Sequence, residues 1–179
     1  MDGLFWELLQ MAITCLGIGY IFMDFFKKPS TEMYYYSRAG RREFLLATIA
    51  AIPSIVFHEL GHKFTAIFFG GIASYHLHPF LFLGVLLKAI GFPFIFIVPA
   101  YVNISGLVSW QYTLTALAGP LVNLAVWGIS KLVTRYEWAK GEKYLFFLVL
   151  GRINKWLFIF NMLPFPGTDG YKVLMGLFV

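Results

Sequence analysis

The chain has 179 residues, of which 59% are hydrophobic and 13% are charged. Soluble proteins are about 45–50% apolar and about 25% charged, so this composition excludes an ordinary soluble domain and predicts an integral membrane protein. The net charge of +5 comes mainly from short basic clusters between apolar segments, which is typical of loops at a lipid headgroup surface. We therefore expect the lipid bilayer, and no nucleic acid, as a partner, and a single membrane-embedded domain over residues 1–179.

Four apolar stretches are long enough to cross a bilayer, which takes about 20 helical residues. They cover roughly residues 4–26, 44–69, 112–134 and 144–163. Polar loops are predicted after the first stretch and, at 131–143, between the last two. The predicted fold class is an all-α multi-pass membrane protein, built as a helical bundle.

Residues 71–110 are apolar but do not fit a further membrane span, because Lys88 would lie near its centre. Four helix-breaking residues interrupt the stretch: Gly84, Gly91, Pro93 and Pro99. Three segments have the composition of strands: SYHLH at 74–78, FIFIV at 94–98 and AYVNI at 100–104. We therefore expect a re-entrant or β-hairpin element against the bundle. Non-helical backbone at membrane depth needs protein or water around it, so this element implies a cavity.

The segment FHELGHKFTA, residues 57–66, places two histidines and a glutamate in an apolar span. In a helix, His58 and His62 lie one turn apart on one face, where two imidazoles can bind one metal ion, and this spacing suits zinc. Glu59 lies between them and could take a proton from an attacking water without binding the metal. The alternative is that these residues only pack helices together, but ionisable groups inside a span are usually functional.

A catalytic zinc site typically has three protein ligands, so one more side chain is needed. The candidates are Asp2, Asp24, His76, His78, Asp169 and the remaining glutamates. Asp169 stands out because it lies in FNMLPFPGTDGYK, where prolines and glycines end the fourth apolar helix. An aspartate that caps a short following helix, or that occupies an Asp-Gly turn, accounts for this residue equally well. Histidines that alternate, as at 76 and 78, are more typical of a loop or rim.

Three motifs, taken in order, resemble the site-2 proteases, a family of intramembrane zinc metalloproteases. They are HELGH at 58–62, AGPLVNL at 118–124 and NMLPFPGTDG at 161–170. The resemblance implies one catalytic zinc ion held by His58, His62 and Asp169. It also implies Glu59 as the catalytic base and Asn123 as a hydrogen-bond donor to the oxyanion or to substrate backbone. A structural role for Asn123, bonding across helices, is the alternative. Thr168 and Tyr171 stand where many relatives have Leu and a second Gly.

The function implied by this resemblance is hydrolysis of peptide bonds in or near transmembrane segments of membrane-anchored protein substrates, in a prokaryotic cell membrane. The 71–110 element is expected to accept extended substrate by strand addition. Helix breaks at Pro120 and at 164–170 are expected to open a polar cavity. The face to which the site opens is left undecided, because the positive-inside rule and the resemblance give opposite answers.

Two other functions are consistent with parts of the sequence. A CAAX-type membrane zinc endopeptidase can share HELGH but takes a downstream glutamate as third ligand, here Glu137 or Glu142. The Glu-x-x-x-Asp pattern expected of that class is absent, because residue 141 is glycine. An inactive membrane scaffold or metal-binding chaperone is the second alternative. The intact Glu59 argues against it, since a metal binder needs ligands but no base.

Overall fold

The computed structural model describes residues 2–27, 39–92 and 100–178. Within these ranges, four helices are long and apolar enough to cross a membrane: Gly3–Phe26, Arg41–Phe68, Ser109–Arg135 and Glu142–Met162. They agree with the four predicted spans to within a few residues. The all-α multi-pass class predicted from composition is therefore confirmed.

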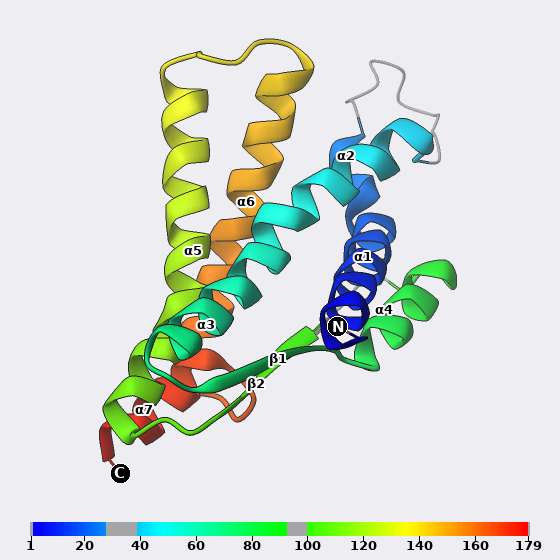
Figure 1. Ribbon diagram of the computed structural model, residues 1–179. Helices are drawn as coiled ribbons and strands as arrows, with labels where there is room; N and C mark the ends of the chain where they lie inside the picture. The colour runs from blue at the N-terminus through cyan, green and yellow to red at the C-terminus, as the bar shows by residue number, and fades with distance from the viewer. Residues whose placement is uncertain (1, 28–38, 93–99, 179) are drawn as a thin grey trace.

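The elements follow one another in a simple order. They are α1 (Asp2–Phe22), a 3-10 turn η1 (Met23–Phe26), α2 (Arg41–Ala51), a π-helical turn η2 (Ile52–Val56), α3 (Phe57–Phe68), β1 (Ile72–Leu77), α4 (Phe80–Ala89), β2 (Ala100–Ser105), α5 (Ser109–Arg135), α6 (Glu142–Met162) and α7 (Asp169–Phe178). Helix α5 packs against α3, α6 and α7, while α1 packs against α2 and α4. Both termini and the two strands lie at the same end of the bundle (Figure 1).

Small and polar residues contribute to the contacts between helices, beside two buried clusters of apolar side chains. This is expected in lipid, where close backbone approach and side-chain hydrogen bonds replace the hydrophobic driving force. A Cβ atom at Gly61 of α3 would lie 3.1 Å from the carbonyl oxygen of Ala118, so α3 and α5 touch almost backbone to backbone. Buried Asn154 of α6 donates a hydrogen bond of 2.8 Å to Ser54 of η2. Many large apolar side chains instead face outward, toward lipid.

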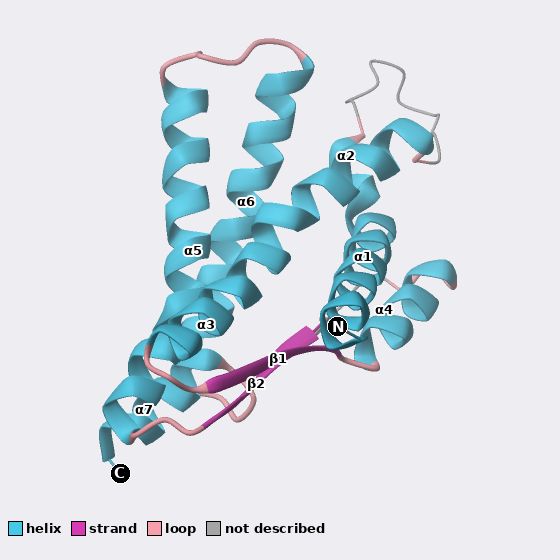
Figure 2. Ribbon diagram, viewed as in Figure 1, coloured by secondary structure: helices cyan, strands magenta, loops and turns pink. Residues whose placement is uncertain are grey.

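The two strands form one antiparallel sheet at the base of the bundle, with Tyr75 opposite Val102 (Figure 2). Strands were predicted at 74–78 and 100–104, and both are confirmed. The third predicted strand, 94–98, lies outside the described residues. Helix α4 was not predicted; at ten residues it is too short to cross a bilayer. Lys88, in its last turn, pairs with Asp24 of η1.

Two expectations about helix boundaries are wrong. Pro120 does not break α5, which continues through it from Ser109 to Arg135. A proline removes one helical hydrogen bond, but Pro120 is fully buried, and the packing around it holds the helix together. The loop predicted at 131–143 starts later, because α5 includes 131–135. The break predicted at 164–170 is present, since α6 ends at Met162 and α7 begins at Asp169.

Candidate metal centre

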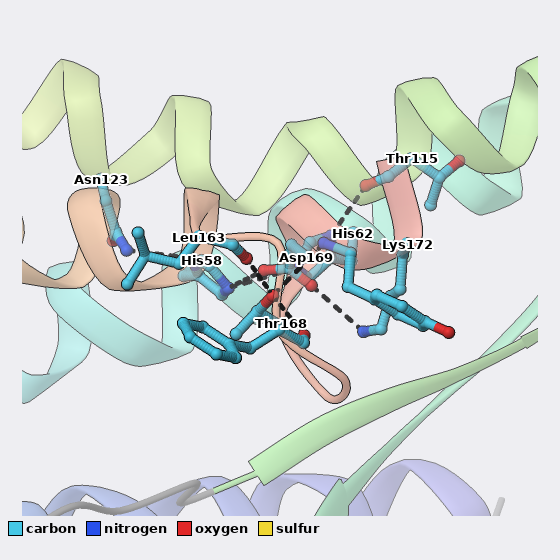
Figure 3. Close-up of polar contacts among 10 residues, drawn as sticks. His58, His62, Thr115, Asn123, Leu163, Thr168, Asp169 and Lys172 are labelled. Atoms are coloured by element: carbon cyan, nitrogen blue, oxygen red, sulfur yellow. Dashed lines mark hydrogen bonds and ion pairs between the residues drawn. The ribbon is translucent and has the colours of Figure 1, made fainter. Parts of the chain in front are cut away.

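Two imidazoles from one helix face meet inside the bundle. His58 and His62 lie one turn apart on α3, and both are buried. Their Nε2 atoms are 3.1 Å apart, and Figure 3 shows both side chains at the site with Asp169. The π-helical turn η2, which contains Pro53, directly precedes α3. Turns of this kind are frequent at functional sites because they shift the register of the helix that follows.

Asp169 completes a triangle with these two nitrogens. Its Oδ2 atom lies 3.1 Å from His58 Nε2 and 3.3 Å from His62 Nε2. A tetrahedral zinc ion with ligand bonds of about 2.0–2.1 Å separates its ligand atoms by about 3.3 Å. The three atoms already stand at this spacing, so the residues fit a zinc ion. In the part of the chain that the structure describes, they form the one group of three such side chains able to hold a metal.

The segment between α6 and α7 places Asp169 at the site. Thr168 precedes the first residue of α7, and its hydroxyl accepts a 3.3 Å hydrogen bond from the Tyr171 N–H, as an N-cap does. The same hydroxyl donates to the carbonyl oxygen of Leu163. A Cβ atom at Gly170 would lie 2.4 Å from the carbonyl oxygen of Met162, so only glycine lets α7 begin this close to the end of α6. Asp169 is therefore both the first residue of α7 and a member of the site.

Backbone and side-chain groups of α5 orient both imidazoles. His62 Nδ1 lies 2.7 Å from the carbonyl oxygen of Thr115, to which it donates, so its Nε2 lone pair is free for a metal. The carboxamide nitrogen of Asn123 lies 3.0 Å from His58 Nδ1, while the buried Asn123 oxygen has no hydrogen-bond partner among the described residues. Turning the carboxamide over would let that oxygen accept the Nδ1 proton, which frees His58 Nε2 in the same way. The orphaned oxygen thus supports a metal-ligand role for His58.

Gly119 forms the floor beneath the two imidazoles. A Cβ atom there would lie 2.3 Å from His62 Nε2 and 2.8 Å from His58 Cε1. Both rings are held from their other nitrogen by α5, so they have little freedom to move away. A residue without a side chain is therefore required at this point of α5.

The charge of Asp169 is balanced on two sides. Burial acts to raise the pKa of its carboxyl group, but hydrogen bonds with His58 and His62 outweigh it and hold that pKa well below its ordinary value. Its second oxygen, Oδ1, accepts a 3.1 Å hydrogen bond from the Lys172 ammonium group. Burial acts to lower the pKa of Lys172, but the charge of Asp169 and the hydrogen bond to it, with smaller contributions from other groups, together raise that pKa above its ordinary value. Asp169 is thus held as a carboxylate, the form that binds a metal.

A cavity of about 490 Å³ opens beside the site. Its walls come from α3, α5, β2, α7 and the turn before α7, and include His62, Val102, Asn103, Tyr112, Pro166 and Lys172. Glu59 is buried on α3 beside His58. Metal-binding atoms, a buried carboxylate and space for a ligand are therefore together.

Other ligand candidates among the described residues lie elsewhere, and Glu32 lies outside the described residues. Asp24 pairs with Lys27 and Lys88 at the far end of α1. His76 contacts Ser74 within β1, and His78, on the cavity wall, bonds the N–H of Phe80. Glu142 pairs with Arg42. The loop between α5 and α6, which contains Glu137, lies at the end of the bundle opposite the strands (Figure 1). Neither glutamate required by a CAAX-type site is near His58. The sequence did not indicate Thr115, Gly119 or Lys172 as parts of the site.

The fold and the site together define a multi-pass membrane protein with a buried metal centre of the HExxH type. The chain is 31% identical over 172 residues to "Putative zinc metalloprotease MJ0611" of Methanocaldococcus jannaschii, covering 94% of this chain and 83% of that protein. It therefore belongs to the same family of zinc metalloproteases as that protein. No family model matches the chain, and no solved structure matches it significantly.

Two further relatives carry names of the same kind. "Putative zinc metalloprotease Rip2" of Mycobacterium tuberculosis is 33% identical over 155 residues, covering 73% of this chain. The chain spans 56% of that protein, so about half of the Rip2 length is compared. "Putative zinc metalloprotease YwhC" of Bacillus subtilis is 28% identical over 163 residues, covering 80% of this chain and 73% of that protein.

Proposed function

We propose that this chain is an intramembrane zinc metalloprotease of the site-2 protease type. It would hydrolyse peptide bonds in or near transmembrane segments of membrane-anchored proteins in a prokaryotic cell membrane. The observation that carries the proposal is the triangle of His58, His62 and Asp169 atoms at zinc spacing, buried between spanning helices and beside a cavity. The three motifs that resemble site-2 proteases contribute the residues of this triangle and of its floor.

The chain's own residues divide the chemistry among them. A zinc ion bound by His58, His62 and Asp169 would supply Lewis acidity and lower the pKa of water to about 7. Glu59 takes a proton from the attacking water while the water oxygen forms a bond to the scissile carbonyl carbon. Glu59 then returns that proton to the departing amine nitrogen as the C–N bond breaks. The peptide bond is thus hydrolysed with Glu59 as the one residue that carries the proton.

Asn123 and Lys172 support this site from two sides. The Asn123 carboxamide is fully buried and contacts His58, so we assign it to holding that imidazole in position. The oxyanion role expected from the sequence stays a prediction, and it requires this contact to open. Lys172 neutralises the outer oxygen of Asp169 and faces the cavity, where its charge also favours a developing oxyanion.

The outer edge of β2 is the proposed docking edge for an extended substrate. In an antiparallel pair, residues that bond across the ladder alternate with residues whose N–H and C=O groups point outward. Tyr75 donates its N–H away from β2, so its opposite residue, Val102, also points its backbone groups outward. Val102 and Ile104 line the cavity beside His62. A substrate strand added here would run past the metal ligands.

The purified protein is expected to bind one zinc ion and to cleave a model transmembrane substrate. A strong chelator should abolish cleavage, and added zinc should restore it, because three buried side chains hold the metal without a covalent link. Zinc content is measured by elemental analysis, and cleavage by mass spectrometry of the products. Stoichiometric zinc with no cleavage of any membrane substrate would instead favour the inactive scaffold.

Replacing Val102 with Pro is expected to reduce cleavage of a transmembrane substrate about tenfold without changing the zinc content, since one outward N–H is lost while the ladder to β1 stays intact. Val102→Ala keeps that N–H and is the matched control. Steady-state cleavage rates and zinc content are compared for the three proteins. Equal rates for Val102→Pro and Val102→Ala would exclude strand addition at this edge.

A further inference from the structure

The outer edge of β1 is already occupied, although no strand pairs with it in the described part of the chain. The Tyr75 N–H donates a 3.0 Å hydrogen bond to Glu7 Oε1, and the Leu77 N–H donates a 2.8 Å bond to Gln10 Oε1. These two N–H groups are alternate residues of β1, the spacing at which a neighbouring strand would accept them. Two side chains of α1 therefore take the places of two backbone carbonyls.

The same face of α1 also binds the side chain of Tyr75. Glu7, Gln10 and Thr14 are three, four and seven residues apart, so they share one helix face. The Tyr75 ring is fully buried, and its hydroxyl donates a 2.8 Å hydrogen bond to Thr14 Oγ1. The Thr14 hydroxyl in turn donates to the carbonyl oxygen of Gln10. Strand β1 is thus held to α1 through its backbone and through its largest buried side chain.

Glu7 also connects this edge to the helix that carries the metal ligands. Its second oxygen, Oε2, forms an ion pair with the ammonium group of Lys63. Lys63 directly follows His62 on α3. One carboxylate thereby joins α1, β1 and α3, and it does so within a span, where an ionisable group is costly unless it is paired. Neither the metal site nor the cleavage chemistry accounts for this arrangement.

We propose that Glu7 and Gln10 are substrate-positioning residues that close the β1 edge, so that an extended substrate can add to the sheet only along β2. The two side chains are called the α1 cap. An open sheet has two edges, and the cavity that His62 lines is also lined by residues of β2 but by none of the residues of β1. The α1 cap removes the unproductive edge and fixes the sheet at a constant distance from α3. This inference rests on the proposed function, because it assumes that the substrate adds as a strand.

The test compares variants that lose the acceptor atoms with variants that keep them. Glu7→Ala and Gln10→Ala remove the oxygen that accepts from β1, whereas Gln10→Glu retains one. Glu7→Gln retains the acceptor and loses only the charge that pairs with Lys63. Leu9→Ala changes an outward-facing residue of the same helix and is the matched control. All variants are studied as full-length, zinc-loaded protein in detergent or nanodiscs.

Two measurements are made on each protein. Amide hydrogen exchange follows the N–H groups of Tyr75 and Leu77, and steady-state cleavage of a transmembrane substrate gives kcat and KM. In Glu7→Ala and Gln10→Ala we expect exchange at the affected residue to accelerate about tenfold, the effect of one lost hydrogen bond. KM should rise by a similar factor, with kcat and zinc content close to the parent values. Gln10→Glu and Leu9→Ala should behave as the parent does.

Each other outcome has a distinct meaning. Unchanged exchange in both alanine variants would overturn the α1 cap, because the β1 edge would then be closed by something else. Faster exchange with unchanged KM would overturn its role in substrate positioning, and loss of zinc in both variants would make it a structural support only. If the parent cleaves no substrate, the proposed function fails and the positioning role fails with it. Exchange would still show whether Glu7 and Gln10 close the edge.

Discussion

Replacing Glu59 with Gln is expected to lower the rate of substrate cleavage by about 10²–10⁴-fold while leaving the zinc content unchanged. The amide has nearly the same size as the carboxylate, so it fits the same buried position on α3. It cannot accept the proton of the attacking water, and it has no proton to return to the departing amine. Single-turnover cleavage of a transmembrane substrate, with elemental analysis of the same samples, measures both quantities.

Asp169→Ala serves as the contrasting variant, since it removes a ligand and leaves the base. Zinc binding and cleavage should then fall together, because two histidines alone hold the ion weakly. Its loss also leaves Lys172 without the carboxylate that now accepts its hydrogen bond. Normal cleavage by Glu59→Gln would show that the Glu59 carboxylate is not the base.

Replacing Gly119 with Ala is expected to weaken zinc binding by at least about tenfold, although no ligand is altered. The new methyl group would lie 2.3 Å from His62 Nε2, so the imidazole has to leave its place. Moving the ring breaks its 2.7 Å hydrogen bond to the Thr115 carbonyl oxygen. Zinc affinity, measured by competition with a chelator of known affinity, and the cleavage rate should both fall.

Gly128→Ala is the matched control for this change. It lies on the same helix, and a Cβ atom there has no neighbour within 4 Å. An alanine in an open helical position is favourable by up to about 1 kcal/mol, so this variant should be at least as stable as the parent. Parent-like zinc affinity in Gly119→Ala would mean that the imidazoles bind no metal in the observed arrangement.

The spans and strands were predictable because they depend on composition within one segment. Uninterrupted apolar runs predict spanning helices, and the β-branched and aromatic residues of 100–104 predict a strand. Helix α4 was not predictable on this basis, since its sequence is apolar with an internal Gly84 and is followed by Gly91 and Pro93. Pro120 misled the interpretation for the opposite reason. The local preference of proline predicts a helix break at this position, but Pro120 is fully buried and the packing around it keeps the helix continuous.

From the sequence, only those site residues whose side chains perform the chemistry were predictable. His58, Glu59 and His62 stood out because their residue types and spacing indicate metal chemistry, whereas the choice of Asp169 depended on the resemblance of its motif to the site-2 proteases. Thr115 acts through its backbone carbonyl group, which every residue has, so its residue type does not indicate this role. The need for glycine at 119 appears only once α3 and α5 are in contact. Glu7 and Gln10 likewise gain a role only when β1 lies beside α1.

The positions of the three ligand residues along the chain also set the order in which the site is assembled. His58 and His62 are synthesised before Asp169, which follows the four helices long enough to span a membrane. Because a ribosome adds residues from the N-terminus onward, a nascent chain holds the two histidines and the base long before it holds the third ligand. The three-residue group is therefore complete only after α3, α5 and α6 have all been synthesised.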